Sequence, residues 1–168
     1  MSRYVDCRKY LKCCNDNYIV NPCCNNIIVD NNNSQIFRSF LNGRKEVPSN
    51  NSSATGVLLA LLSPDEQRLD FILHTQGLTN IVSAHFHDAP KGVNGPIVKT
   101  IPINAISGNA IGTWTSTDSE PLTPQLVAKL KAGGIYVNVH TAAFPGGEIR
   151  AQVLQIRRNA SICDRSAL

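Results

Sequence analysis

Apolar and polar residues alternate along much of the chain, and this pattern predicts strands. From Arg68 to His74, for example, Leu69, Phe71 and Leu73 occupy every second position. Successive side chains of a β-strand point to opposite faces, so such a segment has one face suited to a core. Similar short runs recur between turns rich in Gly, Pro, Asn and Ser. The predicted strands span residues 36–41, 54–62, 68–74, 81–87, 97–103, 111–115, 135–141 and 148–156.

A single segment, at about residues 123–132, carries the signature of a helix. Thr123 is a suitable N-cap, Pro124 suits the first helical position, and Gly133-Gly134 suits the end. Many short strands with regular turns and one brief helix are typical of an all-β fold. The pattern therefore predicts an antiparallel β-sandwich or barrel.

The two ends of the chain differ from the rest in composition and in apolar pattern. Residues 1–33 are rich in Asn and Cys and hold only two short apolar, β-prone runs, at 18–20 and 27–29. Neither run is long enough to stand alone, but either suits addition to a sheet edge, in this subunit or in a neighbour. We therefore expect an extended N-terminal connector arm at 1–33, a β-sandwich at 34–156 and a C-terminal tail at 157–168.

Composition excludes several classes of protein. The net charge of +4 is mild, and no basic stripe interleaved with aromatic residues is present, so we expect no nucleic-acid partner. No apolar run approaches the roughly 20 residues of a membrane-spanning helix, so we expect no membrane span. The segment from Met1 to Tyr18 has basic residues but no apolar core, which predicts that it is not a secretory signal peptide.

The cysteines concentrate in the arm, where five of the six lie. They include two adjacent pairs, Cys13-Cys14 and Cys23-Cys24, and adjacent cysteines rarely bond to each other because the small ring is strained. The arm is either a leader with free thiols or a connector that cross-links subunits; we favour the connector. A standard zinc site is weakly supported there, because no Cys-x-x-Cys or histidine is present. The candidates for intermolecular disulfides are Cys7, Cys13, Cys14, Cys23, Cys24 and Cys163.

Three of the four histidines are candidates for a metal site. His85 and His87 lie on one face of a predicted strand, with Cα atoms about 7 Å apart, and His140 ends another alternating run. Three imidazoles, with Glu148 as a candidate fourth ligand, would suit zinc or copper. In the alternative interpretation the imidazoles hydrogen-bond the 88–96 loop and the final hairpin, and Glu148 pairs with Arg150.

No arrangement of nucleophile and base is visible, so the residues indicate no catalytic site. We expect no enzyme activity and no required cofactor, with zinc or copper as the candidate ions.

Four motifs in order resemble the CHRD family, the domain first described in chordin. They span about residues 37–153, and they read LNGRKEVP followed by ATG, then AHFH, then YVNVHT, and last PGGEIR. The resemblance implies an immunoglobulin-like β-sandwich module of extracellular proteins, without an established enzyme activity. The strand with His85 and His87 also resembles the copper-side strand of copper-zinc superoxide dismutase, another β-sandwich. The chain lacks the further histidines and the bridging ligand of that enzyme.

The cysteine pairs of the arm resemble the leaders of spore-coat and endospore-appendage subunits. Those subunits are made without a signal peptide and are later exposed and cross-linked. Our leading hypothesis is a structural, self-assembling subunit of a disulfide-linked extracellular or spore-surface fibre, appendage or coat layer. Its partner would be a second copy of the chain, joined through the arm. The alternative is a zinc- or copper-binding CHRD module, or a superoxide-dismutase-like metalloenzyme, that uses His85, His87 and His140.

Overall fold

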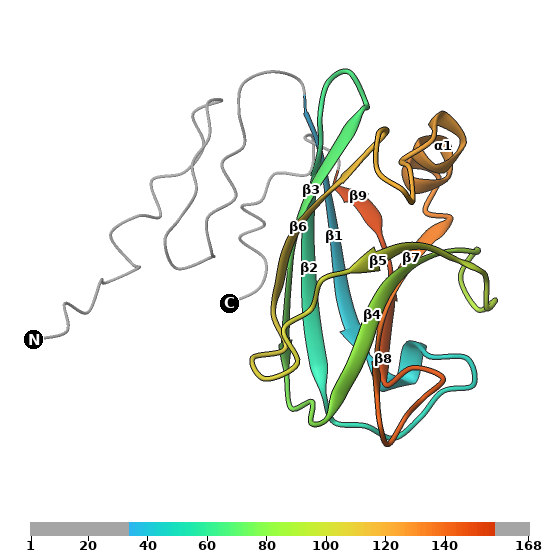
Figure 1. Cartoon of the computed structure of the whole chain (residues 1–168). Helices are drawn as coiled ribbons and strands as arrows, with labels where there is room; N and C mark the ends of the chain where they lie inside the picture. Colours follow the sequence, from blue (N-terminus) through green and yellow to red (C-terminus); the bar gives the residue numbers. More distant parts are fainter. Residues whose placement is uncertain (1–33, 157–168) are drawn as a thin grey trace, which may run out of the picture.

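Nine strands and one α-helix make up the part of the chain that the computed structural model describes, residues 34–156 (Figure 1). The all-β prediction is confirmed. In chain order the elements are β1 (Gln35–Asn42), the 3-10 helix η3 (Gly43–Lys45), β2 (Thr55–Leu62), β3 (Arg68–Gln76), β4 (Ile81–Asp88), β5 (Ile97–Ile101), β6 (Ala110–Thr115), α1 (Pro124–Lys131), β7 (Ile135–Thr141), β8 (Ile149–Gln152) and β9 (Leu154–Ile156).

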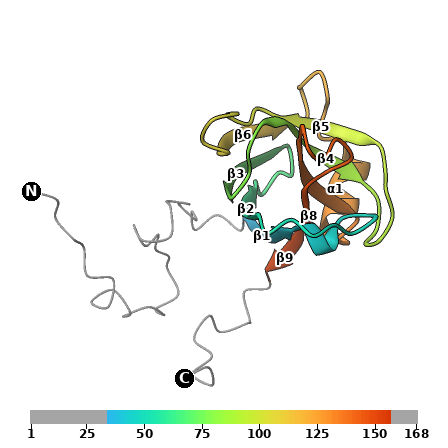
Figure 2. The same ribbon diagram turned by 90° about the horizontal axis from the view of Figure 1, so that it is seen from below.

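The strands form a single antiparallel sheet in the order β5-β4-β7-β8-β1-β2-β3-β6, with β9 also paired to β1. This sheet curls until its two edge strands, β5 and β6, come into contact. Seen from below, the strands enclose a common interior (Figure 2). The sandwich expected from the sequence is thus one curled, barrel-like sheet rather than two separate sheets.

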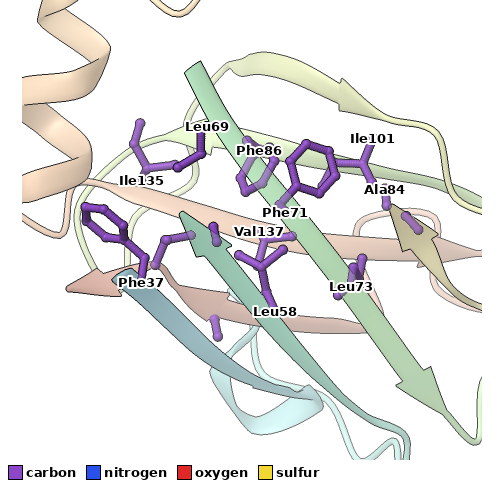
Figure 3. Packing of buried hydrophobic residues seen from close by; sticks show 14 of the residues in the cluster. Phe37, Leu58, Leu69, Phe71, Leu73, Ala84, Phe86, Ile101, Ile135 and Val137 are labelled. Carbon is purple, nitrogen blue, oxygen red and sulfur yellow. The ribbon is translucent and has the colours of Figure 1, made fainter. Parts of the chain in front are cut away.

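The alternating pattern fills the interior as predicted. Leu69, Phe71 and Leu73 of β3 are buried, and Phe71 meets Phe86 of β4 edge to face with ring centroids 5.2 Å apart (Figure 3). Phe86 in turn stacks on the fully buried Trp114, with centroids 5.5 Å apart. Because Phe86 faces this core, its strand neighbours His85 and His87 face the other side of the sheet.

Helix α1 has the predicted boundaries and cap. The Thr123 side chain accepts a hydrogen bond from the backbone N–H of Leu126, and Pro124 occupies the first helical position. Its buried residues include Val127 and Leu130, and the helix packs beside β7 and β9. The helix therefore packs beside β7, one of the two strands that carry the candidate site.

Two predicted strands are wrong in extent. The strand expected at 148–156 breaks at Val153, whose N–H bonds to the carbonyl of Ile135 at 2.9 Å. The break ends the pairing with β7, because β8 lies between β7 and β1 whereas β9 pairs with the start of β1. The strand expected at 97–103 ends at Ile101, because a tight turn bonds the Ile103 N–H to the Ile101 carbonyl at 2.8 Å.

The predicted arm at 1–33 and tail at 157–168 lie outside the described residues. All six candidate disulfide cysteines lie in these two segments. Within residues 34–156, no helix is long and apolar enough to cross a membrane.

Candidate metal centre

The pairing of β4 with β7 brings three histidines together. These strands run antiparallel, with Ser83 opposite His140 and His85 opposite Asn138. Residues opposite each other in a sheet point to the same face, so the three imidazoles of His85, His87 and His140 share the face away from the core. The sequence predicted that His85 and His87 share one face. The register of β4 and β7 brings His140 to the same face.

The imidazoles are close enough to bind one ion. Each of the three histidines offers one ring nitrogen, and these atoms all lie within 4.8 Å of one another. The rings of His85 and His140 have centroids 5.0 Å apart, and those of His85 and His87 are 5.7 Å apart. Zinc–nitrogen bonds of about 2.1 Å place two tetrahedral ligands about 3.4 Å apart. Small side-chain rotations would therefore suffice to bring the nitrogens to bonding distance.

Backbone carbonyls orient two of the rings. Nδ1 of His87 lies 3.0 Å from the carbonyl oxygen of Gly95, and Nδ1 of His140 lies 2.9 Å from that of Pro145. A carbonyl oxygen only accepts, so Nδ1 carries the proton in both rings and Nε2 keeps its lone pair. The alternative interpretation of these histidines, that they fasten the 88–96 loop and the hairpin, is thus realised with one nitrogen of each ring. The second nitrogen, Nε2, of His87 and of His140 takes no part in these contacts.

The remaining nitrogens have no hydrogen-bond partner. His85 Nδ1, His87 Nε2 and His140 Nε2 are all buried and unpaired. A buried polar atom without a partner is costly, and such atoms in folded proteins call for an explanation. A carbonyl on the far nitrogen of a metal-ligating histidine is the usual arrangement around bound ions. The residues present therefore fit an ion held by three imidazole nitrogens.

The surroundings of His85 and His87 favour the neutral form of these two imidazoles. Burial, together with the neighbouring imidazoles of His140 and His87, lowers the pKa of His85 to about 4. Burial also lowers the pKa of His87, while the Gly95 carbonyl acts in the opposite direction. Metal ligation requires a neutral imidazole. Neither His85 nor His87 has to lose a proton at neutral pH before an ion binds.

A stack of side chains supports His87. Its ring lies parallel to that of Tyr136, with centroids 4.6 Å apart, and the Arg150 guanidinium lies 3.4 Å from the Tyr136 ring centroid. Arg150 is 2% exposed, and its two terminal nitrogens donate to Asn94 Oδ1 and to the Val93 carbonyl. The 88–96 loop is therefore bonded to the sheet at both His87 and Arg150.

Glu148 does not join this group. Its carboxylate accepts hydrogen bonds from Ser52 Oγ at 2.7 Å and from Thr141 Oγ1 at 2.5 Å. The expected pair between Glu148 and Arg150 is not formed either, because the Arg150 nitrogens turn to Asn94 and the Val93 carbonyl. Two residues on one face of a strand need not meet when loops cover that face.

Two residues beside the histidines were not predicted from the sequence. Asn138, 3% exposed, faces His85 across the strand pair, and Glu46, 6% exposed, reaches the same place from the loop after η3. Burial raises the pKa of Glu46 to about 7, against the opposing effect of the Arg150 charge. The alternation of the 136–141 segment did place Asn138 on the face of His140, which is the signal that could have identified it.

The fold and site define an all-β domain with a cluster of three histidines on its outer face. Comparison with known protein families matches the CHRD domain over residues 37–153, and the chain belongs to that family. CHRD domains occur in secreted and extracellular proteins, and the family is not a known enzyme family. No curated protein and no solved structure matches the chain.

Proposed function

We propose that this CHRD domain binds one zinc or copper ion through His85, His87 and His140. Two observations carry the proposal: one ring nitrogen from each of the three histidines lies within 4.8 Å of the others, and each histidine has a buried ring nitrogen without a hydrogen-bond partner. Zinc and copper are the ions in question because both favour imidazole ligands. When bound, the ion would act as a Lewis acid or, as copper, as a one-electron centre.

A two-metal centre like that of superoxide dismutase has less support. The fourth histidine of the chain, His74, lies on β3, is exposed, and shares a hydrogen bond of 2.7 Å with Asn109. It is not in the group of facing imidazoles. The chain's histidines thus suit one ion, and we favour a metal-binding module over a redox enzyme.

The test is metal stoichiometry in a chain with all six cysteines replaced by serine, because thiols also bind zinc and copper. After removal of metal with a chelator, the protein is titrated with Zn²⁺ or Cu²⁺ and analysed by mass spectrometry. We expect about one ion per chain, lost in His85→Ala, His87→Ala and His140→Ala. The matched control is His74→Ala, which should bind as the parent does. Equal retention of metal in all four variants would refute the site.

A second proposal concerns assembly, and the cysteine pattern of the sequence supports it. Five cysteines lie in residues 1–33 and the sixth, Cys163, lies near the other end of the chain. We expect them to link copies of the chain into an extracellular or spore-surface fibre, appendage or coat layer. A non-reducing gel of native material should show a ladder that collapses with reductant and weakens in the double variant Cys13→Ser, Cys14→Ser. Monomer alone, with all thiols free, would contradict this proposal.

A further inference from the structure

A fourth buried polar atom beside the three histidines also lacks a partner. It is Asn138 Oδ1, on the β7 residue that faces His85 across the strand pair. The Asn138 amide lies close enough to His87 to raise the pKa of that imidazole. Yet neither His87 Nε2 nor Asn138 Oδ1 has a hydrogen-bond partner. The unpaired oxygen therefore belongs to the surroundings of the unpaired nitrogens.

Glu46 lies beside the nitrogen end of the Asn138 amide. An added Cβ on Gly147 would lie 2.5 Å from Glu46 Oε1 and 2.8 Å from Asn138 Nδ2, so these two groups meet over the bare glycine. A hydrogen bond from Asn138 lowers the pKa of Glu46, which opposes the effect of burial. The amide nitrogen donates and the carboxyl oxygen accepts. With Nδ2 beside the Glu46 carboxyl group, Oδ1 is the end of the amide that lacks a donor.

We infer that a water molecule occupies the fourth position of the ion and that Asn138 Oδ1 accepts its hydrogen bond. The inference rests on the proposed metal site. Three imidazole ligands leave a coordination position open to solvent or to a small exogenous ligand. A metal-bound water carries protons to donate, and Asn138 Oδ1 is a buried acceptor without a donor. Direct ligation by the amide oxygen is less favourable, because such hard ligands suit magnesium and calcium rather than zinc or copper.

This arrangement gives Asn138 a role in choosing the fourth ligand. Water has a proton for Oδ1, whereas an anion such as azide has none to donate and would leave Oδ1 unpaired. Asn138 therefore favours a ligand that donates a hydrogen bond over one that does not. Glu46 acts as a positioning residue, because it touches the amide nitrogen and not the fourth ligand.

The test uses Co²⁺ as a spectroscopic probe in the full chain with its cysteines replaced by serine. Azide is titrated into the Co²⁺-loaded protein, and its dissociation constant is read from the visible absorption bands. In Asn138→Ala we expect Co²⁺ to bind as before and azide to bind about fivefold more tightly, as the loss of one hydrogen bond to the competing water predicts. The matched control is Ser83→Ala, which removes a polar group opposite His140 on the same face and should leave azide affinity unchanged.

Two further variants separate positioning from general damage. Glu46→Gln keeps an oxygen that accepts from Asn138 Nδ2, so it should retain the parental azide affinity. Glu46→Ala should shift that affinity in the same direction as Asn138→Ala. Circular dichroism and thermal unfolding establish that each variant is folded.

The outcomes that overturn the inference are distinct from those that overturn the metal site. Bound Co²⁺ with an unchanged azide affinity in Asn138→Ala would dismiss the water contact and leave the metal site standing. Loss of Co²⁺ affinity by a hundredfold or more in folded Asn138→Ala would instead make the amide a direct ligand. Failure of the parent chain to bind Co²⁺, Zn²⁺ and Cu²⁺ would remove the proposed function, and this inference with it.

Discussion

Acid should destabilise the metal-free domain through His85. Burial and the neighbouring imidazoles hold the pKa of His85 at about 4 in the folded chain, compared with 6.5 for a free histidine. Between these two values the unfolded chain binds a proton at this residue and the folded chain does not. The free energy of unfolding therefore falls as the pH falls from 6.5 to about 4, and the contribution of His85 is fully present above 6.5.

The size of this effect follows from the shift of the pKa. One pKa unit corresponds to about 1.4 kcal/mol, so a change from 6.5 to about 4 gives an upper bound of about 3.4 kcal/mol. His85 is only partly buried, and solvent screens part of this energy. We therefore expect a loss of about 1–2 kcal/mol between pH 7 and pH 4 that is due to this residue.

The assay compares the parent with His85→Gln by urea unfolding at pH 7 and at pH 4, with chelator present. The glutamine does not titrate, so the parent should lose about 1–2 kcal/mol more than the variant over this interval. Protonation of the carboxylates changes the stability of both proteins equally, so it cancels when the parent is compared with the variant. His74→Gln is the matched control, and it should lose as much stability as the parent. Equal losses in the parent and in His85→Gln would refute the argument that a buried neutral imidazole opposes protonation.

Three other predictions address the rest of the site. Burial raises the pKa of Glu46 from 4.5 to about 7, so the metal-free parent should lose stability as the pH rises through 7. Glu46→Gln should remove that loss. In urea unfolding the variant should be more stable than the parent by up to about 3 kcal/mol at pH 8, with little difference at pH 4. Gly147→Ala should cost about 2–3 kcal/mol in thermal unfolding, since Gly147 has φ +127° and a Cβ there meets Glu46, whereas Gly146→Ala enters open space and should cost less than about 1 kcal/mol. Zn²⁺ at 100 times its Kd should raise the Tm of the parent by about 10 °C, measured by scanning calorimetry, and should leave His140→Ala unchanged.

Most of the strands were predictable because every second residue of a strand that borders the core is apolar. Leu69, Phe71 and Leu73 alternate with polar residues, and a strand with one buried face requires this alternation. The boundaries at Ile101 and Val153 were not predictable, since they depend on a tight turn and on the point where pairing with β7 ends. Neither event leaves a periodic trace in the sequence.

The histidine cluster was predictable only in part. The spacing of His85 and His87 places them on one face of a strand whatever the rest of the chain does. Their approach to His140 depends on the register that sets Ser83 opposite His140, and one residue of slip would turn His140 to the core. Which ring nitrogen faces inward depends on the carbonyls of two loops, which no strand pattern specifies.

The acidic partner was misassigned for a related reason. Glu148 was the candidate fourth ligand, and it stands near His140 in the sequence. In the fold its carboxylate is held by Ser52 and Thr141, while Glu46 comes to the site from the other end of the domain sequence. Distance along the chain is a poor guide where loops from several strands cover one face of a sheet.

The two interpretations of the histidines, as loop fasteners and as metal ligands, are compatible with each other. An imidazole has two nitrogens, and a carbonyl that accepts from one of them fixes the lone pair on the other. In the proposed metal site, His87 and His140 would be ligands of fixed direction because they hold the loops at Gly95 and Pro145. Because the same rings would contact both the loops and the ion, binding of an ion and ordering of these loops should favour each other.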